Sequence, residues 1–403
     1  MHILLIHQAF VALDEAGGTR HYEIAANLVG KGHHVTIIAS PVSYLTGKDD
    51  KKTPSKQVVD GITIFRTYTY PALHKSFIHR VISFLSFMIS SFVKSIQVHN
   101  IDLVWGTSPP IFQALSAWLI ARLKGVPFLL EVRDLWPAFA IQVGVLKNPL
   151  LIKLSLWLEG FLYRHADLVV VNSPGYLDHV KNKGAFNIEL IPNGSDATMF
   201  DPNSHGNSFR TRNQVDGKFL VVYAGAHGLS NDLGVILEAA RKLMDETRIH
   251  FIFIGDGKEK YNLVARARQM NLKNVTFIDP VSKKEMAEVL AAANACIAIL
   301  KPLELYQTTY PNKVFDYMAA GRPILLAIDG VIRKVVESAQ CGVFVAPGDA
   351  QDLEEKVLWM LYHSDEVEKM GINGRDYLEK HFNRSQLSDK FIIAIEKLIK
   401  NYG

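Results

Sequence analysis

Two doubly wound α/β domains are the architecture that this sequence predicts, and three observations lead to it. Short β-branched or apolar runs alternate with longer helical patterns through most of the chain, as in parallel βαβ units. The length of 403 residues exceeds that of one ordinary domain, while 48% hydrophobic and 21% charged residues are typical of a globular protein. A polar stretch at 201–218, rich in Asn, Ser, Asp and Gly, interrupts the series near its middle.

The first series of strands and helices defines an N-terminal domain, which we expect over residues 1–200. Helical patterns such as 21–31 and 111–123 separate its strands. These strands are expected at 2–6, 35–39, 62–66, 103–106, 128–132, 168–172 and 188–191.

A second series defines a C-terminal domain over 201–384, with 201–218 as the linker candidate that leads into it. A helical pattern at 385–400 lies outside this series. The strands of the second domain are expected at 219–223, 250–254, 275–278, 296–300 and 324–327.

Charge and cysteine content exclude several classes of protein. The formal net charge is only +4, so no basic surface of the kind that binds nucleic acid is indicated. Cys296 and Cys341 have no CxxC spacing and no His cluster, so neither a disulfide framework nor a zinc site is expected. The first seven residues lack the basic start of a signal peptide and are typical of a strand. We therefore expect a cytoplasmic protein.

The most informative segment is 310–323, a loop that enters a helix ending at Gly321. Unpaired amides and the positive dipole end of a helix N-terminus suit a diphosphate. Lys313 in the first turn adds a positive charge, and Asp316 lies one turn further on the same face, where its carboxylate suits ribose hydroxyls. Without other context, a solvated surface pair is the alternative for these two residues.

Glycine-rich turns follow successive strands of the second domain, and such turns let the backbone approach a phosphate. Repetition at successive strand ends favours a ligand crevice over simple turns. The residues of these turns that we place in the crevice are Gly225, His227, Gly228, Gly255, Gly257, Pro280 and Val281.

Two segments of the first domain also place polar groups after strands. Gly17, Gly18 and Arg20 follow the first strand without a full GxGxxG, which argues against a dinucleotide site. Arg133 and Asp134 follow the strand at 128–132, at the edge where parallel sheets place their chemistry. The alternative at the second segment is an ion pair of Arg133 with Asp134 or Glu131, with Trp136 in the core.

Together these motifs resemble glycosyltransferase family 4. The segment 310–323 is similar to its motif of two glutamates eight positions apart followed by Ala-x-Gly-x-Pro, with Thr308 and Asp316 at the glutamate positions. Ile191-Pro-Asn-Gly-Ser-Asp196 is similar to its Pro-Asn-Gly-x-Asp hinge. The run Arg133-Asp-Leu-Trp-Pro137 resembles a bacterial subgroup that builds surface polysaccharides, including N-acetylfucosamine transferases.

The resemblance implies a GT-B fold, in which two Rossmann-like domains face each other across a cleft and a terminal helix, here 385–403, crosses back to the first domain. It implies a retaining, metal-independent hexosyltransferase with a nucleotide-sugar donor, commonly a UDP-sugar, and no cofactor. Lys313, Arg133 and Asp134 are then the expected catalytic groups. The donor would contact Gly17, Gly18, Arg20, Gly225, His227, Gly228, Gly255, Gly257, Pro280, Val281, Thr308, Thr309, Tyr310, Pro311, Asn312, Lys313 and Asp316.

Three alternatives to this function remain open. A nucleotide-sugar 2-epimerase would convert the donor without an acceptor, a non-catalytic sensor would bind UDP without transfer, and a dehydrogenase would bind NAD. The absence of Asp-x-Asp pairs and His clusters in suitable loops argues against an obligatory metal. The acceptor, a lipid-linked sugar or a glycan, is not specified by the sequence.

Apolar residues recur at helical spacing over 77–98, with no Asp or Glu from 73 to 99. Arg80 and Lys94 interrupt the apolar run, so it is short of the roughly 20 residues that span a bilayer. We expect this helix to lie on the inner face of the cytoplasmic membrane as a peripheral contact. The alternative is that its apolar face packs on the sheet of the first domain.

Overall fold

A computed structural model describes residues 1–403 except 44, 50–53, 73–74 and 403. The chain forms two compact units. The first unit comprises Met1–Ala12, Gly18–Pro192 and Ser385–Gly403, and the second comprises Leu13–Gly17 and Asn193–Arg384. The chain therefore changes units at Pro192, whereas the sequence analysis placed the boundary at residue 200.

In its described part the first unit has an eight-stranded sheet in the order β3-β4-β2-β1-β5-β6-β7-β8, parallel except for β3. Its elements are β1 (His2–Ile6), α1 (Arg20–Gly30), β2 (His34–Ala39), β3 (Lys56–Val59), β4 (Ile62–Arg66), α2 (Phe77–Ile96), β5 (Leu103–Ser108), α3 (Ile111–Lys124), β6 (Phe128–Val132), α4 (Ala138–Gln142), α5 (Pro149–His165), β7 (Leu168–Val171), η1 (Pro174–Tyr176), α6 (Leu177–Asn182), β8 (Ile188–Leu190) and α15 (Arg384–Tyr402).

The central strands of this sheet are apolar because both faces are covered. Every residue of β5, β6 and β7 is buried, as expected for parallel strands between helices. The strand order reverses between β1 and β5, since β2 lies on the other side of β1. Such a switch point opens a crevice at the carboxyl ends of the strands.

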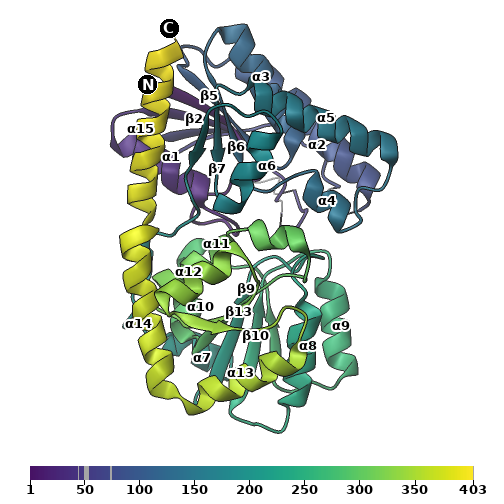
Figure 1. Ribbon diagram of the computed structural model, residues 1–403, viewed down its shortest axis with the longest axis vertical. Coiled ribbons are helices and arrows are strands. Elements are labelled where there is room, and N and C mark those ends of the chain that lie inside the picture. The colour runs from purple at the N-terminus through teal and green to yellow at the C-terminus, as the bar shows by residue number, and fades with distance from the viewer. Residues whose placement is uncertain (44, 50–53, 73–74, 403) are drawn as a thin grey trace. The chain divides into compact units, whose positions relative to one another are not determined.

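Helix α15 belongs to the first unit although it comes last in the chain (Figure 1). Phe391 packs on Trp105, with ring centroids 4.6 Å apart, and Lys31 pairs with Asp389 at 2.6 Å. The helical pattern found at the end of the sequence is therefore confirmed, with contacts to the first domain.

Helix α2 buries the face that carries its serines and not the face that carries its isoleucines. Its buried residues are Ser83, Phe84, Phe87, Ser91 and Ser95. The Ser116 hydroxyl of α3 donates to the carbonyl of Met88 at 2.7 Å. The isoleucines of α2 are exposed, while its small serine side chains let it lie close to α3; the membrane contact stays a prediction.

In its described part the second unit has a parallel six-stranded sheet in the order β11-β10-β9-β12-β13-β14. Its elements are η2 (Ala197–Met199), α7 (Asn207–Arg212), β9 (Phe219–Ala224), α8 (Leu233–Lys242), β10 (Ile249–Ile254), α9 (Lys260–Gln269), β11 (Val275–Ile278), α10 (Lys283–Ala292), β12 (Ala295–Ile299), η3 (Glu304–Thr308), α11 (Asn312–Ala319), β13 (Ile324–Ala327), α12 (Val331–Ala339), β14 (Gly342–Phe344), α13 (Ala350–Tyr362) and α14 (Ser364–His381).

The strand order of this sheet reverses between β9 and β12, so the loops after these two strands flank the switch point. The linker predicted at 201–218 was wrong. The stretch contains α7, and Phe209 and Val215 are buried in the core of the second unit. The polar composition of this stretch gave no sign of α7, and the stretch packs on the core through these two apolar side chains.

Candidate active site

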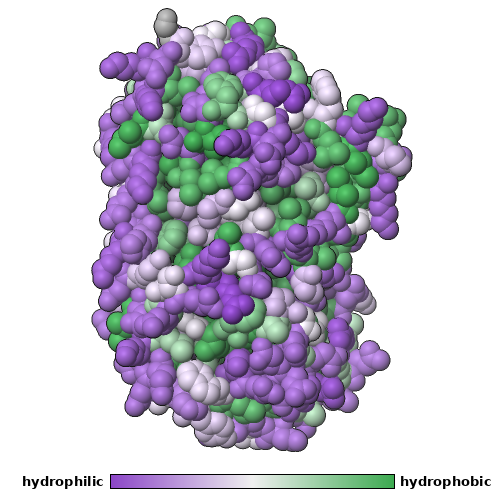
Figure 2. Space-filling model, in the orientation of Figure 1, coloured by the Kyte–Doolittle hydropathy of each residue, from purple (hydrophilic) through white to green (hydrophobic). Residues whose placement is uncertain are grey.

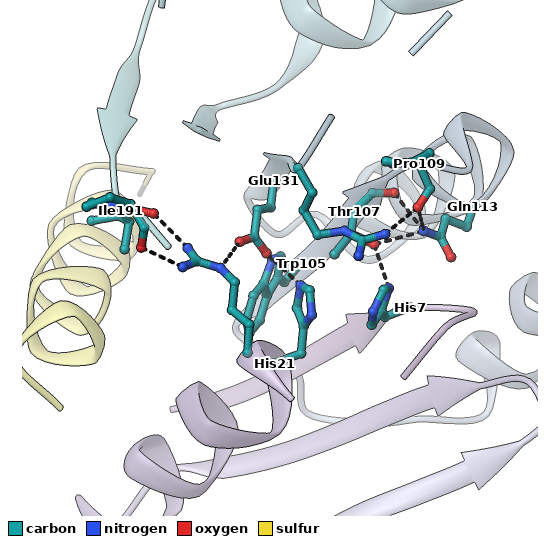
Figure 3. A network of polar contacts seen from close by, with 11 residues as sticks. His7, His21, Trp105, Thr107, Pro109, Gln113, Glu131 and Ile191 are labelled. Carbon is teal, nitrogen blue, oxygen red and sulfur yellow. Dashed lines mark hydrogen bonds and ion pairs between the residues drawn. The ribbon is translucent and has the colours of Figure 1, made fainter. Parts of the chain in front are cut away.

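Glu131 is the centre of a buried polar network in the first unit (Figure 3). Its carboxylate accepts hydrogen bonds from Arg20 Nε at 2.7 Å, His21 Nε2 at 2.8 Å and Trp105 Nε1 at 3.1 Å. Strand β6 supplies the carboxylate, and the first turn of α1 supplies two of its donors. All three donors are themselves buried, so this charge is compensated inside the fold.

Protonation states in the network follow from burial and from the neighbouring charges. Burial alone would raise the pKa of Glu131, but the Arg20 guanidinium and the His21 ring hold it well below its ordinary value. Burial lowers the pKa of His21 in spite of Glu131. At neutral pH the His21 contact is therefore a hydrogen bond from a neutral imidazole.

Arg20 differs from its predicted role in donor binding. Its Nη1 and Nη2 donate to the carbonyls of Pro192 and Ile191 at 2.7 and 2.8 Å, while Nε is held by Glu131. The residue is only 5% exposed. All three guanidinium nitrogens donate hydrogen bonds within the protein. Arg20 therefore holds the segment at Ile191 and Pro192, where the first unit ends, and its guanidinium is not free to bind a phosphate.

A second group of polar residues lies at the switch point of the same sheet. His7 Nδ1, after β1, is 2.9 Å from Thr107 Oγ1 at the end of β5. Gln113 Nε2 donates to the same hydroxyl at 2.8 Å. Arg133 Nη2 donates to the carbonyl of Pro109 at 2.5 Å, so Arg133 extends this group rather than pairing with Glu131.

Asp134 is half-buried, and burial raises its pKa to about 6 although Arg133 opposes this shift. The Tyr176 hydroxyl donates a hydrogen bond to it. A carboxyl group with a raised pKa at the end of a parallel strand is a candidate for a catalytic or substrate-binding residue. The catalytic role predicted for Asp134 and Arg133 remains a prediction.

Lys313 occupies the first turn of α11 in the second unit, and its ammonium nitrogen is shielded from solvent with no hydrogen-bond partner among the described residues. It lies 3.9 Å from the centroid of the Tyr223 ring. Burial lowers the pKa of Lys313 to about 7. A cation in such surroundings would gain from an anionic ligand.

The turn after β9 brings backbone close to this cation. Gly225 has φ +145°, and a Cβ on it would lie 2.9 Å from Lys313 Nζ. A Cβ on Gly255, after β10, would lie 1.9 Å from the carbonyl oxygen of Gly225. Both positions therefore require glycine, and the structure brings together two turns that the sequence singled out.

His227 is fully buried between these turns, and neither ring nitrogen has a hydrogen-bond partner among the described residues. Burial lowers its pKa to about 4, with smaller contributions from Lys260 and Lys313. The ring is therefore neutral, and it offers one donor and one acceptor. Buried polar atoms without partners are unusual and indicate a missing ligand or water.

Several contacts hold the loop that leads into α11. Asn193 Nδ2 donates to the carbonyl of Tyr310 at 2.7 Å, and Arg384 Nη2 donates to Asn312 Oδ1 at 3.1 Å. The Thr308 hydroxyl donates to the carbonyl of Leu305 at 2.6 Å, in η3. Thr308, Thr309, Tyr310, Pro311 and Asn312 are all half-buried, and their predicted contacts to a donor sugar remain predictions.

Asp316 has protein partners that the sequence analysis did not foresee. Lys283 Nζ lies 2.6 Å from its Oδ1, and the Ser195 hydroxyl donates to the same atom at 2.7 Å. Asp316 therefore pairs with Lys283, whose side chain is only 6% exposed, and not with Lys313, so the surface-pair alternative is wrong. The carboxylate links α11 to Ser195 and to α10, and its predicted contact with ribose remains a prediction.

The remaining predicted residues lie on loops. Gly17 and Gly18 are exposed, and the chain divides between the two units at this pair. Gly228, Pro280 and Val281 are half-buried, and Gly257 has φ +154°. In the described part of the chain, no group of three or more His, Cys, Asp or Glu side chains could hold a metal ion.

Sequence reasoning did not foresee the roles of His21, Trp105, Tyr223 and Lys283. His21 and Trp105 lie in elements predicted for their apolar pattern, and no motif distinguishes them. Tyr223 is the exception, because an aromatic residue two positions before Gly225 could have been considered as a neighbour for Lys313.

Known families match both halves of the chain. Residues 16–194 match the family described as "Glycosyl transferase 4-like domain", and residues 206–377 match "Glycosyl transferases group 1". The first of these regions therefore belongs to the glycosyl transferase 4-like domains, and the second to the glycosyl transferases group 1.

Individual relatives are distant in sequence. The putative colanic acid biosynthesis glycosyl transferase WcaI of Escherichia coli is 25% identical over 74% of this chain and 76% of that protein. Two further curated relatives are matched over only 54% of their own length.

Solved structures share the GT-B fold. Sucrose-phosphate synthase from Thermosynechococcus elongatus has a TM-score of 0.80 at 19% identity, with 99% of both chains covered. Anabaena HepE in complex with UDP-glucose has a TM-score of 0.72 at 14% identity, with 98% of this chain and 100% of that chain covered. The prediction of two Rossmann-like domains in a GT-B fold is confirmed.

Proposed function

We propose that this protein is a retaining, metal-independent glycosyltransferase that moves a sugar from a UDP-sugar to a lipid-linked or polysaccharide acceptor. The observation that carries the proposal is the shielded, unpartnered ammonium of Lys313 beside the Gly225 turn. A diphosphate is the ligand that would compensate this cation at a helix N-terminus.

The donor and acceptor classes have separate support. HepE, which shares the fold, has been solved with UDP-glucose, and this makes a UDP-sugar the first donor to test. WcaI is named for colanic acid biosynthesis, and this points to a growing polysaccharide or its lipid-linked precursor.

In the retaining reaction that the family resemblance implies, the acceptor oxygen bonds to the anomeric carbon on the face from which the diphosphate leaves. The donor's own phosphate oxygen takes the acceptor proton, so the protein need not supply a strong base. Lys313, the amides of α11 and the Gly225 turn would stabilise the charge on the departing diphosphate. Asp134 would orient the acceptor.

UDP titration by calorimetry tests the donor site. Wild-type protein should bind UDP, and Lys313→Ala should weaken binding while the fold is kept. Lys369→Ala on α14 is the control, because Lys369 is an exposed lysine of the same unit. UDP affinity equal to wild type in the folded Lys313→Ala protein would remove Lys313 from the site.

Metal independence and transfer need separate assays. Turnover should continue in excess EDTA; loss of turnover that magnesium or manganese restores would contradict the metal-independent mechanism. Product analysis with and without acceptor separates transfer from epimerisation of the donor. The anomeric configuration of the product, read by NMR, tests retention.

The proposal also includes a place in the cell. We expect a cytoplasmic protein that reaches a lipid-linked acceptor at the inner face of the membrane through α2. By length and composition, α2 is the one helix among the described residues that could cross a membrane. Of its most apolar 18-residue stretch, 22% is buried. Its serine face packs on α3, so we place it on the membrane surface and not across it.

A further inference from the structure

The first half of α5 is apolar but remains unburied. The helix begins Pro-Leu-Leu-Ile-Lys-Leu-Ser-Leu-Trp-Leu, yet its buried residues start only at Glu159. Leu150, Leu154 and Trp157 are 64%, 52% and 60% exposed. Single exposed apolar residues are ordinary, but a helix half without any buried side chain is not explained by the core of the unit.

This surface continues onto neighbouring helices. Helix α3 contacts both α2 and α5, and Leu123 of α3 is 67% exposed. On α2, Ile78 and Ile89 are 68% and 60% exposed. Hydrophobic surface extends over the part of the first unit that holds α2 and α5 (Figure 2), and we name these exposed faces of α2, α3 and α5 the apolar face.

Basic residues lie along the helices that form the apolar face. Between 135 and 158 the sequence contains Lys147 and Lys153 and no Asp or Glu, and α2 carries Arg80 and Lys94. Helix α3 ends with Arg122 and Lys124, of which Arg122 pairs with Asp167 at 3.3 Å. An apolar helix with a basic border is the pattern of a segment that lies in an anionic membrane interface.

An aromatic group lies along α5 beside this surface. The ring of Trp157 stacks on Phe161, with centroids 5.5 Å apart, and Phe161 contacts Trp118 at 4.8 Å. Tryptophan is favoured where one end of the ring is apolar and the other is wet, as at the headgroup level of a bilayer.

We propose that α5 and α2 together form a docking surface for an anionic lipid bilayer, with Leu154 and Trp157 entering its interface. Helix α5 is too short to span the hydrocarbon core, which needs roughly 20 apolar residues. A second copy of the chain fits less well, because self-association would bring the lysines of both copies together. The proposal extends the membrane contact of the proposed function to α5, and it requires neither donor nor acceptor.

Flotation with vesicles of phosphatidylcholine and phosphatidylglycerol tests the surface. Wild-type protein should float with these vesicles and bind pure phosphatidylcholine less well. Leu154→Ser combined with Trp157→Ser should lower the partition coefficient by at least about tenfold, because two large apolar side chains leave the interface. The matched control is Ile372→Ser with Ile393→Ser, since these side chains are 57% and 64% exposed on α14 and α15.

The charge component has its own variant. Lys147→Glu with Lys153→Glu should weaken binding to anionic vesicles at low salt by at least about tenfold and leave binding to neutral vesicles unchanged. The melting temperature of each variant should stay near that of wild type, because none of the substituted side chains is buried.

Three results would overturn the proposal. Wild-type protein would not float with anionic vesicles, or the α5 variants would float as well as wild type. Sedimentation would show a wild-type dimer that the α5 substitutions dissociate, which would assign the surface to a second copy. Failure of UDP binding would overturn the proposed function and leave the flotation result standing, so the two proposals fail separately.

Discussion

Glu131 in the first unit and Lys313 in the second are both charged groups shielded from solvent, but they differ in their partners. Glu131 accepts three hydrogen bonds from buried donors. Lys313 has a tyrosine ring beside it and no hydrogen-bond acceptor among the described residues. A charge compensated inside the fold serves the structure, whereas an uncompensated one costs stability unless a ligand binds.

The largest effect should come from breaking the compensated site. Glu131→Gln removes the charge that balances Arg20 and should lower the free energy of unfolding by about 3–5 kcal/mol. Urea unfolding measures this change. Glu246→Gln is the control, because Glu246 forms an exposed ion pair with Arg248; equal losses in both variants would show that the buried network has no special weight.

The opposite pattern is expected at Lys313. Lys313→Met keeps the stem of the side chain and removes a shielded charge, so the free energy of unfolding should stay the same or rise. UDP binding should weaken by about 1.5–3 kcal/mol, the usual loss for a charge-assisted hydrogen bond. Calorimetry and urea unfolding of one preparation give both values, and a large loss of stability would mean that Lys313 has a partner in the fold.

Part of this contrast could be predicted from the sequence. The strands at 62–66 and 128–132 were predicted with the bounds that the structure gives. Alternation of buried and half-buried residues specifies the first strand, and a largely apolar run specifies the second. The glycine turns and Lys313 were found from their place after strands. The edge strands β3 and β14 were missed, since half-buried edge strands carry a weak pattern.

The pairing of side chains could not be predicted. Arg20 and Glu131 lie 111 positions apart, and only the parallel sheet brings α1 beside β6. For α2 the pattern identified an apolar face correctly, but periodicity does not say which face a neighbouring helix will cover. The close fit of serines against α3 decided that question.

A smaller effect should appear as pH is varied. Burial lowers the pKa of Lys313 from 10.5 to about 7, so between these values the unfolded chain binds more protons than the folded one. Stability should therefore rise with pH over this window, by at most about 1.4 kcal/mol per pH unit. The rise should be absent in Lys313→Met. UDP binding at pH 8 should take up a proton in wild type only, which calorimetry in buffers of different ionisation enthalpy detects.

The smallest change in stability is expected at Asp134, which is less fully compensated than Glu131 but, unlike Lys313, accepts a hydrogen bond from Tyr176. Its pKa is raised to about 6 by burial, so the folded protein binds more protons than the unfolded chain between about pH 4 and pH 6, and stability falls with rising pH there. Asp134→Asn should remove this slope and leave the free energy of unfolding near neutral pH unchanged or slightly higher.

Transfer should respond differently from stability at this position. If Asp134 orients the acceptor, Asp134→Asn should slow turnover with little change in UDP affinity, since the residue lies in the first unit and the Lys313 cluster in the second. Tyr176→Phe is the matched control, because it removes the hydrogen bond to Asp134 and keeps the carboxylate. A normal transfer rate with lowered stability in Asp134→Asn would instead show that Asp134, like Glu131, is a charge compensated inside the fold that serves the structure.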